Sequence, residues 1–135
     1  MIKHLSVATS GQGLYDITTQ LTAQLADVSI EEGLCTLFVQ HTSASLIIQE
    51  NADPAVQDDL HNWLNRLVAE HDPLYTHIDE GPDDMPAHIK SVLTATSLSI
   101  PIENHRLVLG IWQGVYLWEH RHHGSTRRIV IHFSE

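Results

Sequence analysis

The segment from Gln40 to Ser45 places an amide, an imidazole and three hydroxyls between two apolar runs. Apolar runs of this kind are typical of a sheet core, where a polar group without a partner costs roughly 1–3 kcal/mol. His41 could act as a metal ligand, a general base or a phosphate contact. Ser43 and Ser45 are expected on one face of an extended chain, because side chains alternate. The alternative is that these hydroxyls only cap a turn or bond neighbouring strands.

Asp84 and His88 form a second candidate site, four residues apart at the expected start of a helix. Residues i and i+4 share one helix face, so the carboxylate could orient the imidazole and raise its basicity. His77, Glu80 and Asp83 lie just upstream and could add ligands for a divalent metal, although no spacing matches a zinc signature. The alternative is that Asp84 only caps the helix and His88 faces solvent.

Two glycines, Gly110 and Gly114, bracket Trp112 and Gln113. Glycine between strands indicates a bulge or a close approach of the backbone. Gln113 would offer both a donor and an acceptor to a ligand or a subunit. The alternative is that Trp112 packs in the core beside a structural bulge.

The stretch from Glu119 to Arg128 is the one basic region of the chain, and it contains Arg121 and Arg127. Arginine forks match phosphate oxygens, and Gly124 to Thr126 offers backbone and hydroxyl donors. The stretch is therefore a candidate anion site, with a solvated hairpin tip as the alternative.

The elements that must position these residues follow from hydrophobic periodicity, turn residues and helix caps. The polar segment 71–83 is predicted to be a loop, long enough to suggest a function. Strands at both ends of the chain with helices between them predict an α+β fold with a largely antiparallel sheet. Strands are expected at 2–8, 34–39, 46–48, 97–102, 106–112, 114–119 and 128–133. Helices are expected from Asp16 as N-cap to about Val28, from Asp53-Pro54 to Val68, and from about 84 to 95.

Length and charge narrow the classes of protein. A chain of 135 residues predicts one domain over 1–135. Seven Lys and Arg against 17 Asp and Glu give a net charge of −10, which argues against non-specific nucleic-acid binding. No apolar run approaches the ~20 residues of a membrane span, and the N-terminus lacks the apolar core of a signal peptide. We therefore expect a cytoplasmic protein with no membrane or nucleic-acid partner, and a buried, inert thiol at Cys35.

Five motifs occur along the chain in one order. They are Gln40-His41-Thr42-Ser43-Ala44-Ser45-Leu46, Glu50-Asn51-x-Asp53-Pro54, Glu80-Gly81-x-Asp83-Asp84-Met85-Pro86-x-His88-Ile89-Lys90-Ser91, Gly110-x-Trp112-Gln113-Gly114, and Glu119-His120-Arg121 with Arg127-Arg128. This order resembles the YjbQ family, also called the secondary thiamine-phosphate synthase family. Two positions depart from the family pattern: His105 stands where the family has Gly, and Ile111 where it has Thr.

The resemblance implies a sandwich-like, mainly antiparallel α+β domain with two to three helices that assembles as a homotrimer. It also implies a weak thiamine-phosphate synthase activity, in which a pyrimidine methyl diphosphate alkylates a thiazole phosphate and releases pyrophosphate. The implied partner is a small phosphorylated or diphosphorylated molecule, and a divalent metal, Mg or Zn, is the candidate cofactor. The alternative is a metal- or phosphate-binding trimer without turnover.

The candidate residues form three groups, and their site is expected to lie between subunits. The catalytic group is His41, Asp84, His88 and Glu119. The substrate-binding group is Ser43, Ser45, Asn51, Trp112, Gln113, Arg127 and Arg128. The metal-ligating group is His41, His88 and Glu119.

Overall fold

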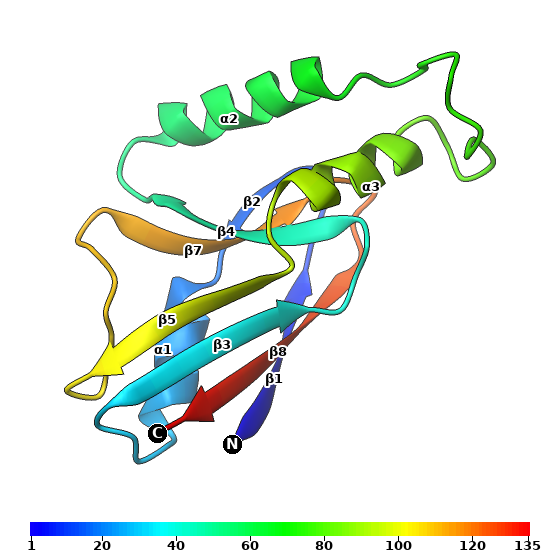
Figure 1. Ribbon diagram of the computed structural model, residues 1–135. Coiled ribbons are helices and arrows are strands. Elements are labelled where there is room, and N and C mark those ends of the chain that lie inside the picture. Colours follow the sequence, from blue (N-terminus) through cyan, green and yellow to red (C-terminus); the bar gives the residue numbers. More distant parts are fainter.

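The computed structural model describes residues 1–135 and contains two antiparallel sheets and three helices (Figure 1). This confirms the α+β class and the antiparallel pairing. The five-stranded sheet has the order β1 (Ile2–Ala8), β8 (Thr126–Ser134), β3 (Gly33–Val39), β5 (Ser97–Glu103) and β6 (Arg106–Leu107). The three-stranded sheet has the order β2 (Gly13–Asp16), β7 (Gln113–Glu119) and β4 (Ala44–Glu50). The helices are α1 (Thr18–Ala26), α2 (Pro54–Leu67) and α3 (Asp84–Leu93).

The main core lies between the two sheets and is completed by α1, whose Leu21 and Leu25 are buried in it. A smaller apolar cluster, with Leu64 of α2 and Trp118 of β7 buried at its centre, joins α2 to the three-stranded sheet. Ile89 of α3 packs against this cluster, so α2 and α3 both lie over that sheet, as Figure 1 shows. None of the three helices is long and apolar enough to cross a bilayer.

The helix predictions hold where local signals determine the helix. Asp53 caps α2 by accepting a hydrogen bond from the backbone N–H of Ala55 at 2.9 Å, with Pro54 at the first helical position. The predicted N-cap of α1 is wrong by one residue. Ile17 occupies the cap, and the Asp16 carboxylate accepts a hydrogen bond from the N–H of Thr18 instead. The reason is that Asp16 is already committed to β2, where it pairs with Tyr116.

Two strand predictions need correction. The short strand β2 was not expected, since the glycines at its start indicate a break. The strand expected over 106–112 ends at Leu107, because the next residues form a turn in which Gly110 N–H donates to the Gln113 side chain at 2.7 Å. Trp112 is therefore 60 % exposed, which excludes it from the core.

The pairing of β4 with β7 fixes which candidate residues can meet. Ala44 pairs with Glu119 at one end, and Glu50 pairs with Gln113 at the other. Seven residues of strand separate these ends by about 20 Å, at roughly 3.3 Å per residue. Residues near Glu119 and residues near Gln113 thus belong to opposite ends of one sheet.

Candidate functional site

Three side chains that can bind metal converge near the start of α3. The atoms His77 Nε2, Asp84 Oδ2 and His88 Nε2 lie within 4.8 Å of one another. Asp84 Oδ2 is 2.6 Å from His77 Nε2 and 3.1 Å from His88 Nε2. We call His77, Asp84 and His88 the triad; two imidazoles and one carboxylate are a donor set used for Zn²⁺ and for other divalent transition metals.

The hydrogen bonding of His88 fixes its tautomer. His88 Nδ1 is 2.9 Å from the carbonyl oxygen of Thr42. A carbonyl oxygen only accepts, so Nδ1 carries the proton and donates. In the neutral ring, Nε2 then presents its lone pair toward Asp84 Oδ2, which is also an acceptor. Two acceptors at 3.1 Å repel each other unless the ring gains a proton or a cation lies between them.

Arg121 and Asp83 hold the carboxylate of Asp84 in place. Arg121 donates from Nη1 to Asp84 Oδ1 at 2.6 Å and from Nε to Asp83 Oδ2 at 2.9 Å. Burial raises the pKa of the Asp84 carboxyl, but the hydrogen bond from His77 and the charges of Arg121 and His88 more than offset burial. The net pKa lies below its usual value, so Asp84 is ionised and available as a ligand.

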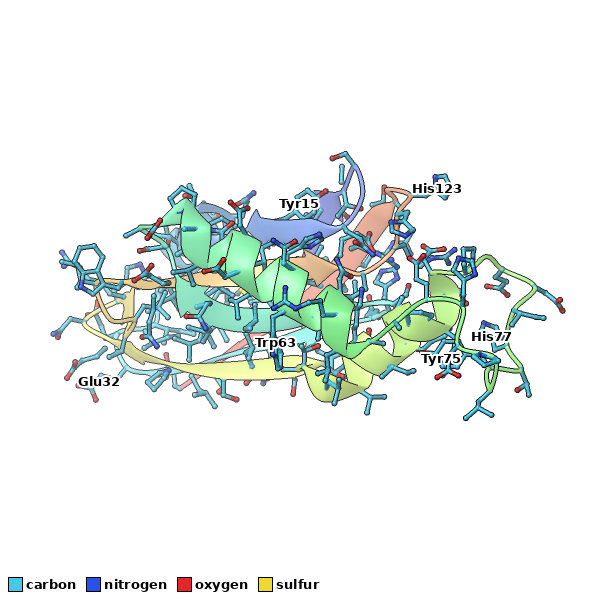
Figure 2. All side chains as sticks on the ribbon, turned by 90° about the horizontal axis from the view of Figure 1, so that it is seen from above. Tyr15, Glu32, Trp63, Tyr75, His77 and His123 are labelled. Carbon is cyan, nitrogen blue, oxygen red and sulfur yellow. The ribbon has the colours of Figure 1, made fainter.

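The triad is assembled from one helix and one long loop. Asp84 and His88 are four residues apart on α3, as predicted. His77 comes from the segment 68–83, which contains no helix or strand. Figure 2 shows His77 at one end of the molecule and Glu32 at the opposite end. The exposed edges of both imidazoles leave the triad open to solvent, with His77 42 % and His88 32 % exposed.

A cavity of about 530 Å³ opens beside the triad. His88 and Thr42 line it together with His41, which connects the triad to the Gln40–Ser45 segment. Its remaining lining is Phe38, Val39, Gln40, Ser91, Val92 and Thr96. A flat heterocycle with polar substituents would meet both apolar and polar walls here.

Glu119 and Arg127 form a buried ion pair next to Ser43 of the Gln40–Ser45 segment. Arg127 donates from Nε to Glu119 Oε1 at 2.8 Å and from Nη2 to Oε2. Glu119 is fully buried and also accepts from the Thr9 hydroxyl at 2.7 Å and from the N–H groups of His120 and Arg121. Both oxygens of the carboxylate therefore accept hydrogen bonds from protein donors. Glu119 is not one of the three triad residues.

The Gln40–Ser45 segment sends its polar side chains to different partners. Ser43 Oγ accepts from Arg127 Nη2 at 3.0 Å, whereas Ser45 Oγ lies 2.8 Å from His120 Nε2. The prediction that the two serines share a face is wrong, because residues 42 and 43 are bends and the strand alternation begins only at Ala44. Ser45 and His120 are both about 1 % exposed. Burial lowers the pKa of His120 to about 3, so its ring is neutral.

The remaining candidate residues lie elsewhere. The N–H of Asn51 donates to the carbonyl of Trp112, and its amide donates to the carbonyl of Gln113, at the far end of β4 and β7. The Arg128 side chain is exposed, while its N–H donates to His41 Nε2 at 2.8 Å. The structure therefore brings His88 and Asp84 together, places His41 nearby, and leaves Asn51, Trp112 and Gln113 apart from them.

Two residues of the site were absent from the predicted groups. The sequence indicates His77 only as one of three loop residues that could add ligands for a divalent metal, and Arg121 only as part of the basic stretch. The available signal is the run of His77, Glu80, Asp83 and Asp84, which places four possible metal ligands close together in the sequence.

Comparisons with known proteins show one family throughout. The model of the family described as "UPF0047 protein YjbQ-like" matches residues 3–135. A UPF0047 protein of Synechocystis is 52 % identical over 96 % of this chain and 88 % of its own. The UPF0047 protein YjbQ of Escherichia coli O157:H7 is 43 % identical over 95 % of this chain and 93 % of its own.

Solved structures agree with the sequence comparisons. A YjbQ/UPF0047 protein of Clostridium acetobutylicum superimposes with a TM-score of 0.90 at 32 % identity, covering 98 % of this chain and 99 % of that one. A conserved hypothetical protein of Thermus thermophilus gives a TM-score of 0.87 at 37 % identity, with 98 % and 99 % covered. The names of these relatives state no activity.

Proposed function

The chain belongs to the UPF0047 YjbQ-like family, and on that premise we propose that it is a divalent-metal-dependent enzyme acting on a small diphosphorylated molecule. The reaction proposed is the one its resemblance implies, a weak and secondary thiamine-phosphate synthase activity. In that reaction the thiazole nitrogen forms a bond to the methylene carbon of the pyrimidine. The carbon–oxygen bond to the diphosphate breaks, and its electron pair leaves with pyrophosphate.

The observation that supports this proposal most is the tautomer of His88. Its Nδ1–H is committed to the Thr42 carbonyl, so Nε2 is free to bind a metal together with His77 Nε2 and Asp84 Oδ2. A partner that fixes the tautomer in this way is the usual support of a metal-binding histidine. A divalent cation held there would act as a Lewis acid and offset the charge of the departing pyrophosphate.

The protein residues around the triad supply orientation and an apolar surface. The carbonyl of Thr42 fixes the ring of His88, and Arg121 fixes the carboxylate of Asp84. Val92 and Phe38, which are both exposed, give the neighbouring cavity apolar surface against which a flat ring could pack. Pyrimidine and thiazole rings are both flat, so this cavity suits either substrate.

One observation favours the alternative, a metal- or phosphate-binding protein without turnover. Arg121 and Arg127 are both paired with internal carboxylates. A cation that is already neutralised stabilises a leaving group less than a free one. Weak activity and absent activity are both compatible with this pairing, and turnover distinguishes them.

The proposal includes assembly as a homotrimer, with the site between subunits, acting in the cytoplasm. Light scattering on the purified protein measures the assembly directly, and a mass of three chains is the expected result. A monomeric protein that is fully active would contradict a shared site.

The test is the formation of thiamine phosphate from the pyrimidine diphosphate and the thiazole phosphate. We expect slow product formation by the parent protein and none by His88→Ala, which removes one triad ligand and keeps the fold. His132→Ala is the matched control, since His132 is exposed on β8 outside the site. Equal activity in His88→Ala and the parent would contradict the proposal. Stoichiometric metal without product would favour the binding protein.

A further inference from the structure

Both ring nitrogens of His41 face N–H donors, and the ring cannot accept a hydrogen bond from each of them. Its Nε2 is 2.8 Å from the backbone nitrogen of Arg128, and its Nδ1 is 3.3 Å from Arg127 Nη1. Both neighbours are N–H donors. A neutral imidazole has one acceptor nitrogen, so only one of these two contacts can be a hydrogen bond.

The shorter contact identifies the acceptor. The N–H of Arg128 belongs to strand β8, which is held on both sides by β1 and β3 and cannot turn away. His41 Nε2 therefore accepts, and Nδ1 carries the proton. Burial and the charge of Arg127 both lower the pKa of His41, which keeps the ring in this neutral form. Nδ1–H and Nη1–H then face each other, donor against donor.

Arg127 has no other acceptor for Nη1. Its Nε binds Glu119, and its Nη2 binds Glu119 and Ser43. His41 Nδ1 is the only group within hydrogen-bonding distance of Nη1. Arg127 is 6 % exposed, and the small part of it that solvent or a ligand can reach borders a polar cleft. A buried guanidinium N–H without an acceptor costs about 1–3 kcal/mol.

We propose that His41 Nδ1–H and Arg127 Nη1–H together form a seat for one phosphate group of a small-molecule ligand, separate from the triad. An oxygen placed beside the two hydrogens would accept from both. This deepens the proposed function and rests on it, because it assigns the phosphate monoester of one substrate to a position different from the metal-bound diphosphate. The charge of Arg128 also acts on His41, in addition to the charge of Arg127. This positive surrounding favours a phosphate ligand over a carboxylate ligand, because the phosphate carries more negative charge.

Space for the rest of the phosphate lies next to Arg127. A cleft of about 210 Å³ has no apolar lining and is formed by Ser43, Arg121, His123, Gly124, Ser125 and Arg127. A Cβ at Gly124 would lie 1.9 Å from the Thr9 carbonyl oxygen, so only glycine permits the close approach that shapes this cleft. Figure 2 shows His123 at the same end of the molecule as His77. His41 lines the larger cavity and contacts Arg127 of the cleft, so a ligand could extend from one to the other.

The test uses inorganic phosphate and metal-free protein in a chelating buffer. Histidine ¹⁵N spectra should show His41 as the Nδ1–H tautomer, with a resonance that shifts when phosphate is added. Titration calorimetry should show phosphate binding that is about tenfold or more weaker in His41→Leu, as expected for a lost hydrogen bond to a charged group. His132→Ala, which removes an exposed imidazole of β8 away from His41, should bind as the parent does.

Three results would overturn the seat: an Nε2–H tautomer at His41, no phosphate binding by the metal-free parent, or equal binding by His41→Leu. The tautomer is read in the parent protein, so this test holds even if His41→Leu does not fold. If phosphate does not bind at His41 and Arg127 but the metal still binds at the triad, the proposed function is unaffected. Loss of metal binding with phosphate binding intact would remove only the metal-dependent reaction.

Discussion

Glu119→Gln separates a structural role of this carboxylate from the metal-ligand role expected from the sequence. The substitution removes the charge opposite Arg127 and leaves a single acceptor oxygen, which can serve either Thr9 or the two backbone N–H groups. The Arg127 side chain is only 8 % exposed, so its cation would be left buried and unpaired. Removing one member of a buried pair typically costs about 3–5 kcal/mol. We expect this loss in the free energy of unfolding, and no change in divalent-metal affinity.

Urea unfolding at a fixed protein concentration measures this effect. With a slope of about 1.5 kcal/mol per molar urea, a loss of about 3 kcal/mol lowers the midpoint by about 2 M. The double variant Glu119→Gln with Arg127→Met removes the stranded cation, so it should be less destabilised than Glu119→Gln alone. Glu103→Gln is the matched control at an exposed strand position and should stay within about 0.5 kcal/mol of the parent.

Two results would refute this reasoning. A loss below about 1 kcal/mol in Glu119→Gln would mean that Arg127 finds other partners or solvent. A loss of metal affinity with unchanged stability would restore Glu119 as a ligand and contradict the triad.

Three further predictions concern stability and reactivity. Burial lowers the pKa of His120 to about 3, against 6.5 when exposed, so the unfolded chain binds a proton that the folded chain does not. Through this group, the free energy of unfolding should therefore fall by about 1.4 kcal/mol for each pH unit as the pH drops from 6.5 toward 3. Urea unfolding curves at three pH values measure this fall, which should be shallower in His120→Gln. Burial raises the pKa of Cys35 to about 11, so an aromatic disulfide reagent should label it only as fast as the protein unfolds; rapid labelling of the native protein would contradict its burial. Asp53→Ala removes the cap of α2 and should cost about 1 kcal/mol in urea unfolding, and an unchanged midpoint would show that the cap contributes nothing.

The parts predicted correctly from the sequence are those that local chemistry determines. Asp53-Pro54 starts α2, and the spacing of Asp84 and His88 places both on one face of α3. The central strands follow from their apolar runs. These features depend on residues within one or two turns of each other, so the chain alone contains the information.

The parts that could not be predicted depend on how distant segments meet. Arg127 on β8 and Glu119 on β7 belong to different sheets, and a spacing of eight residues does not indicate that they meet. The path of the 68–83 loop brings His77 to Asp84. Local spacing therefore predicts Asp84 and His88 as a pair, whereas His77 and the Thr42 carbonyl join them only through tertiary structure.

Metal binding by the metal-free protein tests the central claim most directly. Calorimetric titration with Zn²⁺, Mn²⁺ and Mg²⁺ should show one ion per chain for at least one metal. That affinity should fall at least about tenfold in His77→Ala and in His88→Ala, and stay unchanged in His132→Ala. Parent-like affinity in both triad variants, or no binding of any of the three ions by the parent, would contradict the account.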